Sequence, residues 1–168
     1  MRQFLLITIL LSALCSCGQQ KQSSIGYAEN VGDIAFDKNL DDPNFKVCNE
    51  KQVPQYYNFG KGLQYTGEKP KIIEHFKSFK GLNAPGDSGF ITIRFIVNCE
   101  GKTDRFRVQE MDNDYNSKSF HKEIRDQLLT LTKSLDGWVI VSDQGHIFDY
   151  YQYLTFKIND GKLIEIMP

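Results

Sequence analysis

One segment of the chain has the residue spacing of a calcium-binding loop. Asp112, Asp114, Asn116 and Glu123 occupy the first, third, fifth and twelfth positions of such a loop, and their oxygen atoms are the hard ligands that Ca²⁺ prefers. The sixth position is Ser117, where the loop needs a glycine for its sharp turn, and the preceding segment is typical of a strand. We therefore predict an Asx-type turn in which Asn116 or Ser117 caps the second helix, and no metal ligand here.

The remaining reactive side chains do not form a recognisable catalytic pattern. His75, His121 and His146 fall in three separate predicted elements, without the i, i+4 spacing of a helical zinc pair. The serines lack a Gly-x-Ser-x-Gly elbow, and the Asp41-Asp42 pair lies in a predicted loop with nothing to raise a pKa. The sequence thus predicts a protein that is not an enzyme and needs no cofactor.

The N-terminus has the features of an export signal. Arg2 precedes a short apolar run that is too short to span a bilayer as a helix. The segment Leu14-Cys15-Ser16-Cys17 resembles the bacterial lipobox, which implies cleavage before Cys17 and acylation of its thiol. Cys15 is a poorer candidate, because Leu14 would take the small-residue position. The alternative is an ordinary secretory signal with incidental cysteines.

This assignment divides the chain and predicts its location. Residues 1–16 are the signal peptide, 17–32 a polar flexible tether, 33–62 an arm packed on the domain, and 63–168 the domain itself. The acyl chains on Cys17 would anchor the protein to membrane lipid of the cell envelope, with the domain in the periplasm.

Two further cysteines, Cys48 and Cys99, lie in the exported part. In an exported protein such a pair most often forms a disulfide. The alternatives are two buried thiols or a redox couple, and no Cys-x-x-Cys spacing favours the redox reading.

Charge argues against one class of partner. The chain has 20 basic and 21 acidic residues and no basic stripe of the kind that phosphate binding needs, so nucleic acid is excluded as a partner.

The strand that positions the rest of the domain spans residues 89–101. Ile91, Ile93, Phe95 and Val97 alternate onto one face, while Ile96 is the apolar exception on the polar face. Glu100-Gly101 then predicts a hairpin into a second strand.

Apolar stripes predict two helices. The first begins near Pro70 with the stripe Ile72, Ile73, Phe76 and Phe79, and the second carries an apolar stripe from Phe120 to Leu135.

The C-terminal part predicts further strands. Leu154, Phe156 and Ile158 alternate with polar residues, and Asn159-Asp160-Gly161 predicts a hairpin into a short last strand over 162–166. The fold class is therefore α+β, with an antiparallel sheet of three to five strands and two helices on one face.

The aromatic residues Tyr150, Tyr151 and Tyr153 form the one feature that suggests a ligand. Tyr151 and Tyr153 share the face opposite Leu154, where they would either form a platform for a ligand or be covered by the N-terminal arm.

From about residue 63 onward the chain resembles the TonB C-terminal domain family. The similarity lies in the block Gly89–Gly101, the strand with Phe106 and Val108, Gly137-Trp138, and the closing strand Leu154–Ile158. The resemblance implies a periplasmic domain that binds peptides of outer-membrane receptors by strand addition. The peptide-binding edge then maps to the closing strand, residues Gln152, Tyr153, Leu154, Thr155, Phe156, Lys157 and Ile158.

The chain also departs from that family. It has a lipobox in place of a membrane helix and no Pro-rich spacer, and its last strand would compete for the binding edge. We therefore expect a lipid-anchored protein–protein interaction module, whose partner is an outer-membrane receptor peptide or another envelope protein. The alternative is an envelope ligand-binding protein or enzyme that uses the Tyr150–Tyr153 region.

Overall fold

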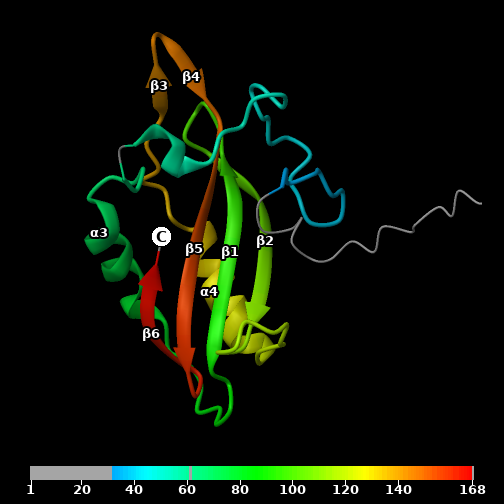
Figure 1. The fold of residues 1–168 in the computed structure, drawn as a ribbon, viewed down its shortest axis with the longest axis vertical. Helices are drawn as coiled ribbons and strands as arrows, with labels where there is room; N and C mark the ends of the chain where they lie inside the picture. The colour runs from blue at the N-terminus through cyan, green and yellow to red at the C-terminus, as the bar shows by residue number, and fades with distance from the viewer. Residues whose placement is uncertain (1–31, 61, 168) are drawn as a thin grey trace, which may run out of the picture. The chain divides into compact units, whose positions relative to one another are not determined.

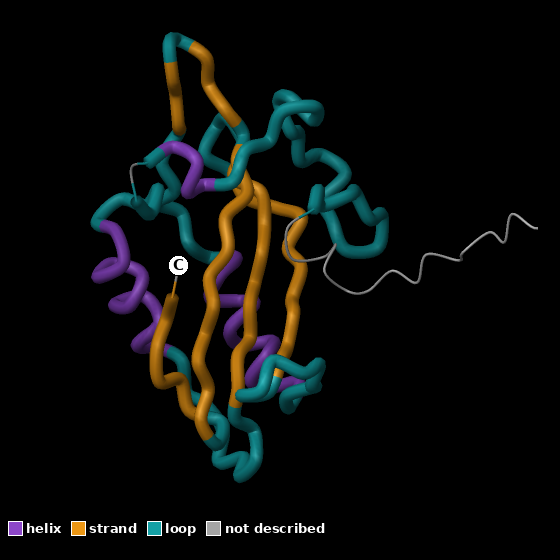
Figure 2. Tube along the Cα trace, viewed as in Figure 1, coloured by secondary structure: helices purple, strands orange, loops and turns teal. Residues whose placement is uncertain are grey.

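The computed structural model describes residues 32–60 and 62–167, and its main element is a four-stranded antiparallel sheet (Figures 1 and 2). β1 (Gly89–Val97) pairs with β2 (Thr103–Met111) on one side and β5 (Tyr150–Asn159) on the other, and β6 (Lys162–Met167) pairs with β5. The strand order is β2-β1-β5-β6, so β2 and β6 are the edge strands. A separate hairpin of β3 (Val141–Asp143) and β4 (His146–Phe148) precedes β5.

Helices cover one face of this sheet. α3 (Glu68–His75) continues into the 3-10 turn η3 (Phe76–Ser78), and α4 (Lys122–Lys133) follows β2. Both contribute to one buried cluster with the sheet, and its members include Ile72, Phe76, Ile91, Ile93, Phe95, Ile124, Leu128, Leu154, Phe156 and Ile158. The α+β prediction is confirmed. Ile73, which was expected in the first stripe, is 45% exposed.

The tight turn between β5 and β6 follows from the backbone conformation of two residues. Asp160 and Gly161 both have positive φ, 47° and 78°, as a two-residue hairpin turn of the primed type requires. A Cβ at Gly161 would lie 2.2 Å from the Leu82 carbonyl oxygen, so only glycine fits. The predicted Asn-Asp-Gly hairpin is therefore present.

The opposite face of the sheet is partly covered by the N-terminal arm (residues 33–62). Ile34 from the arm packs with Ile96 and Tyr151, and Phe45, Val47 and Val53 complete this second cluster. Ile96 is fully buried for this reason. The apolar residue that breaks the alternation of β1 thus marks the place where the arm docks.

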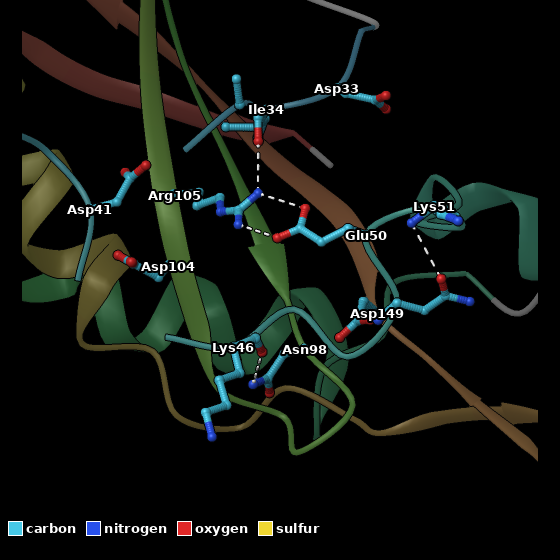
Figure 3. Close-up of polar contacts among 12 residues, drawn as sticks. Asp33, Ile34, Asp41, Lys46, Glu50, Lys51, Asn98, Asp104, Arg105 and Asp149 are labelled. Carbon is cyan, nitrogen blue, oxygen red and sulfur yellow. Dashed lines mark hydrogen bonds and ion pairs between the residues drawn. The ribbon is translucent and has the colours of Figure 1, made fainter. Parts of the chain in front are cut away.

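Two arginines on β2, Arg105 and Arg107, hold the arm by charged hydrogen bonds, and Figure 3 shows those of Arg105. The Arg105 guanidinium donates to the Ile34 carbonyl oxygen at 3.1 Å and forms an ion pair with Glu50. Arg107 donates to both carboxylate oxygens of Asp41, at 2.7 and 2.8 Å. These hydrogen bonds from Arg107 hold the pKa of Asp41 below its ordinary value.

The arm ends in η2 (Tyr56–Phe59), a 3-10 turn beside the start of β5. The Tyr151 N–H donates to the Pro54 carbonyl oxygen at 2.9 Å, and Gln55 forms a parallel bridge with Tyr151. Tyr56 contacts Tyr153 edge-on, with 5.4 Å between ring centroids. The arm therefore borders β5 where β6 has ended.

Candidate functional site

The predicted disulfide between Cys48 and Cys99 is present, with a Cα–Cα distance of 6.1 Å. It links the arm to the turn that follows β1, so the arm is fastened to the sheet covalently as well as by the arginines. Disulfides of this kind occur in exported proteins.

A buried carboxylate lies beside this disulfide. Asp149 is 1% exposed and accepts hydrogen bonds from the Asn49 N–H at 2.7 Å and the Cys99 N–H at 2.9 Å. One of its carboxylate oxygens and the Sγ atoms of Cys48 and Cys99 all lie within 4.8 Å of one another. Sequence reasoning missed Asp149, whose only signal was an acid placed in an apolar run between Phe148 and Tyr150.

The candidate ligands that were considered and set aside from the sequence do not come together in the described part of the chain. The Asp112 carboxylate accepts hydrogen bonds from the backbone N–H groups of Asp114 and Asn116, both at 2.9 Å, which is an Asx-type turn. The predicted helix cap is wrong, because α4 begins after His121 and no side chain that the structure describes caps its first N–H groups. His75 contacts the Leu131 carbonyl oxygen, and His121 binds Asp87 at 2.7 Å. Among the described residues, only Cys48, Cys99 and Asp149 group as metal ligands would.

Cys17, the predicted lipidation site, lies outside the described residues. Within the described residues, no helix has the length and apolar character needed to cross a membrane.

The predicted peptide-binding edge needs correction. Its residues, Gln152, Tyr153, Leu154, Thr155, Phe156, Lys157 and Ile158, all lie in β5, which is an interior strand. β1 pairs with the whole of this segment, and β6 pairs with it from Thr155 onward. At the Tyr153 carbonyl oxygen, the Gln152 side chain itself donates a hydrogen bond at 2.8 Å. The prediction failed because the short last strand adds to β5 and takes over the edge.

The aromatic region is mostly covered. Tyr150 is fully buried, and its hydroxyl donates to the Val139 carbonyl oxygen at 3.0 Å. Tyr151 is 4% exposed, because Ile34 packs on it and the Arg94 guanidinium lies 4.6 Å from its ring centroid. Two alternatives were considered for these tyrosines, a ligand platform or coverage by the arm. Tyr151 is covered by the arm, whereas Tyr153 is half-buried and packs against Tyr56.

Because β6 adds to β5, the edge of the sheet on this side is β6, and β2 is the edge on the other side. Backbone groups in an antiparallel strand point alternately to its two neighbours. The Tyr151 N–H faces the arm, away from β1, so Lys157 and its partner Glu165 face each other across the β5–β6 pair. Ile166 therefore directs its N–H and C=O outward.

A bulge shapes this edge. The register of β6 shifts between Lys157 and Ile158 of β5, so that Ile164 is the extra residue and Leu163 pairs with Ile158. Leu163 consequently also points its backbone groups outward, and the Ile164 side chain is 57% exposed. The strand order gives β6 no further partner strand among the described residues.

A surface depression of about 630 Å³ lies on the exposed side of α4, lined by Lys122, Glu123, Asp126, Gln127 and Thr130 among others. It is open, and Lys122 is already paired with Asp126, one turn further along α4. Nothing there resembles a nucleophile beside a base.

Comparison with known proteins adds no relative. No protein-family model matches the sequence, and neither the curated proteins nor the solved structures gave a match.

Proposed function

We propose that this protein is a lipid-anchored, non-enzymatic interaction module of the bacterial cell envelope that binds an extended segment of a partner protein at the outer edge of β6. The observation that carries this proposal is the strand order, which leaves β6 as an edge with the backbone groups of Leu163 and Ile166 pointing outward. An unpaired edge accepts an extended peptide because the peptide completes its hydrogen bonds.

The anchor and the partner class rest on the sequence. The lipobox at Cys17 supports acylation and residence at the envelope. The similarity of residues 63–168 to the TonB C-terminal domain supports a peptide of an outer-membrane receptor as the partner. The bulge at Ile164 restricts pairing to a short segment, so we expect a weak complex that forms and dissociates readily.

A crosslinking experiment in intact cell envelopes tests the edge. A photo-crosslinking amino acid at Ile164 is expected to yield a discrete adduct with an envelope protein. The same probe at Ile147 is the matched control, because this residue of the β3–β4 hairpin is 56% exposed, against 57% for Ile164. Equal adducts at both positions would show contact by chance and contradict the proposal.

A second variant tests the role of the backbone. Leu163→Pro removes an outward N–H without removing a hydrogen bond of the sheet, since proline is tolerated where the N–H faces solvent. We expect the adduct at Ile164 to disappear, and we expect the urea midpoint to fall only as far as in Leu163→Ala, because Leu163 also packs against the main core cluster. A folded Leu163→Pro variant that still forms the adduct would exclude strand addition at β6.

The anchor has a separate test. Cys17→Ala is expected to release the protein from membranes, whereas continued sedimentation with membranes would refute acylation at this thiol.

A further inference from the structure

We infer that Cys48, Cys99 and Asp149 form a binding site for a divalent cation such as Zn²⁺ when the Cys48–Cys99 disulfide is reduced to two thiols. This site is independent of the β6 edge. In the oxidised protein the two sulfurs are bonded to each other and cannot bind a cation. Reduction converts them to thiols, which supply two of the three ligands.

The donor set fits such a cation. Two thiolates and one carboxylate are common ligands of Zn²⁺, and three protein ligands leave one tetrahedral position for water or another ligand. The Sγ atoms and a carboxylate oxygen already lie within 4.8 Å of one another. Cys48 is exposed and Cys99 half-buried, so the open position would face solvent.

The site does not depend on the sulfur–sulfur bond to hold it together. Asp149 accepts hydrogen bonds from the residue after Cys48 and from Cys99 itself, so one buried side chain ties both cysteine backbones. Asn98 donates to the Lys46 carbonyl oxygen at 3.0 Å, and Arg105 binds Glu50 (Figure 3). These contacts flank both cysteines and would keep the two thiols close after reduction.

The backbone spacing also suits a shared metal. Two sulfurs that each lie about 2.3 Å from one tetrahedral Zn²⁺ are about 3.8 Å apart. With Cα atoms 6.1 Å apart, rotation of the two side chains can reach this separation without moving the backbone. Asp149 can keep its backbone hydrogen bonds, because a carboxylate has about four lone-pair positions.

The redox step is an ordinary exchange with a dithiol. A thiolate of the dithiol attacks the exposed Sγ of Cys48, the sulfur–sulfur bond breaks, and Cys99 leaves as a thiolate that takes up a proton. The second thiol of the reductant then displaces Cys48, which also takes up a proton, and the reductant ends as a disulfide. Binding of the cation displaces both thiol protons.

Cobalt titration tests the inference. The full chain is prepared with Cys15→Ser and Cys17→Ser, so that Cys48 and Cys99 are its only cysteines. After reduction with a phosphine and removal of the phosphine, Co²⁺ is expected to produce a thiolate-to-cobalt charge-transfer band that saturates at one Co²⁺ per chain and is displaced by Zn²⁺. The oxidised protein should give no such band. Absence of the band in folded, reduced protein would overturn the inference, as would saturation at one Co²⁺ per two chains.

Two variants assign the ligands. Asp149→Asn is expected to weaken Co²⁺ binding at least about tenfold, since even groups that only orient a ligand account for 10–100-fold. Glu100→Gln is the matched control, because Glu100 is an exposed acid next to Cys99 that pairs with Lys102. The Co²⁺ affinity of this variant should equal that of the reduced parent protein. If both variants weaken Co²⁺ binding equally, the effect comes from the loss of negative charge in general, and Asp149 is not a ligand. If Asp149→Asn does not fold, loss of the band in Cys48→Ser supports the site, and an undiminished band overturns it.

Discussion

Replacing both disulfide cysteines, in the variant C48S/C99S, should lower the free energy of unfolding by about 4 kcal/mol. The crosslinked residues are separated by 51 positions in sequence, and the chain-entropy relation for a loop of that size predicts a loss of about 4 kcal/mol at 25 °C. For a domain of this size, the melting temperature should fall by roughly 10–16 °C.

The structure also predicts where this loss originates. Arg105, Arg107 and the packing of Ile34 hold the arm without the disulfide, so the folded state should stay the same and the change should lie in the unfolded chain. Urea unfolding should therefore show a lower midpoint together with a larger m-value, because the unlinked chain exposes more surface when it unfolds.

The control is wild-type protein reduced chemically, which should match C48S/C99S in both midpoint and m-value. Limited proteolysis under native conditions completes the assay, and the arm should stay as resistant in the variant as in the oxidised protein. An unchanged midpoint would refute the entropic reasoning. Rapid cleavage within residues 33–53 of the variant would show that the arm depends on the disulfide, contrary to the contacts described above.

Three further changes test the packing and charge arguments. Asp41→Asn should lower the free energy of unfolding by about 2–3 kcal/mol in urea at pH 7, because it leaves the partly buried Arg107 without its carboxylate. The pKa of Asp41 is lowered in the folded state, so its stabilisation is complete above the ordinary pKa near 4 and is lost as the pH falls through the folded value. The stabilities of variant and wild type should therefore converge in acid. Ile96→Ala should cost about 2–5 kcal/mol despite its position on the nominally polar face, and a cost below 1 kcal/mol would show that the arm does not pack there. Gly161→Ala should lower the melting temperature more than Gly145→Ala, because a Cβ at Gly161 meets the Leu82 carbonyl oxygen whereas a Cβ at Gly145 meets nothing within 4 Å, and both glycines have positive φ.

Much of the fold could be predicted from short stretches of sequence. The alternation of Ile91, Ile93, Phe95 and Val97 assigned the buried face of β1, and the stripe from Phe120 to Leu135 located α4. The residues Asn159–Gly161 likewise predicted the hairpin between β5 and β6. Each of these features depends on neighbouring residues within one element, where spacing along the chain fixes which side chains share a face.

The candidate sites depended on pairings that spacing along the chain does not specify. Sequence predicted the disulfide, because the predicted export signal and lipobox leave Cys48 and Cys99 as one possible pair. It could not reveal Asp149, since a lone acid before Tyr150 acquires meaning only when the fold brings it to Cys48 and Cys99.

The free edge shows the same division. Residues 152–158 had the right pattern for a strand, and sequence determined that a hairpin and a further short segment follow it. Only the tertiary structure decided that this segment adds to β5 and that the arm covers Tyr151, which moves the open edge to β6. The physical reason is that several segments can pair with the same strand through its backbone hydrogen bonds. The sequence of one segment alone does not determine which of them pairs there.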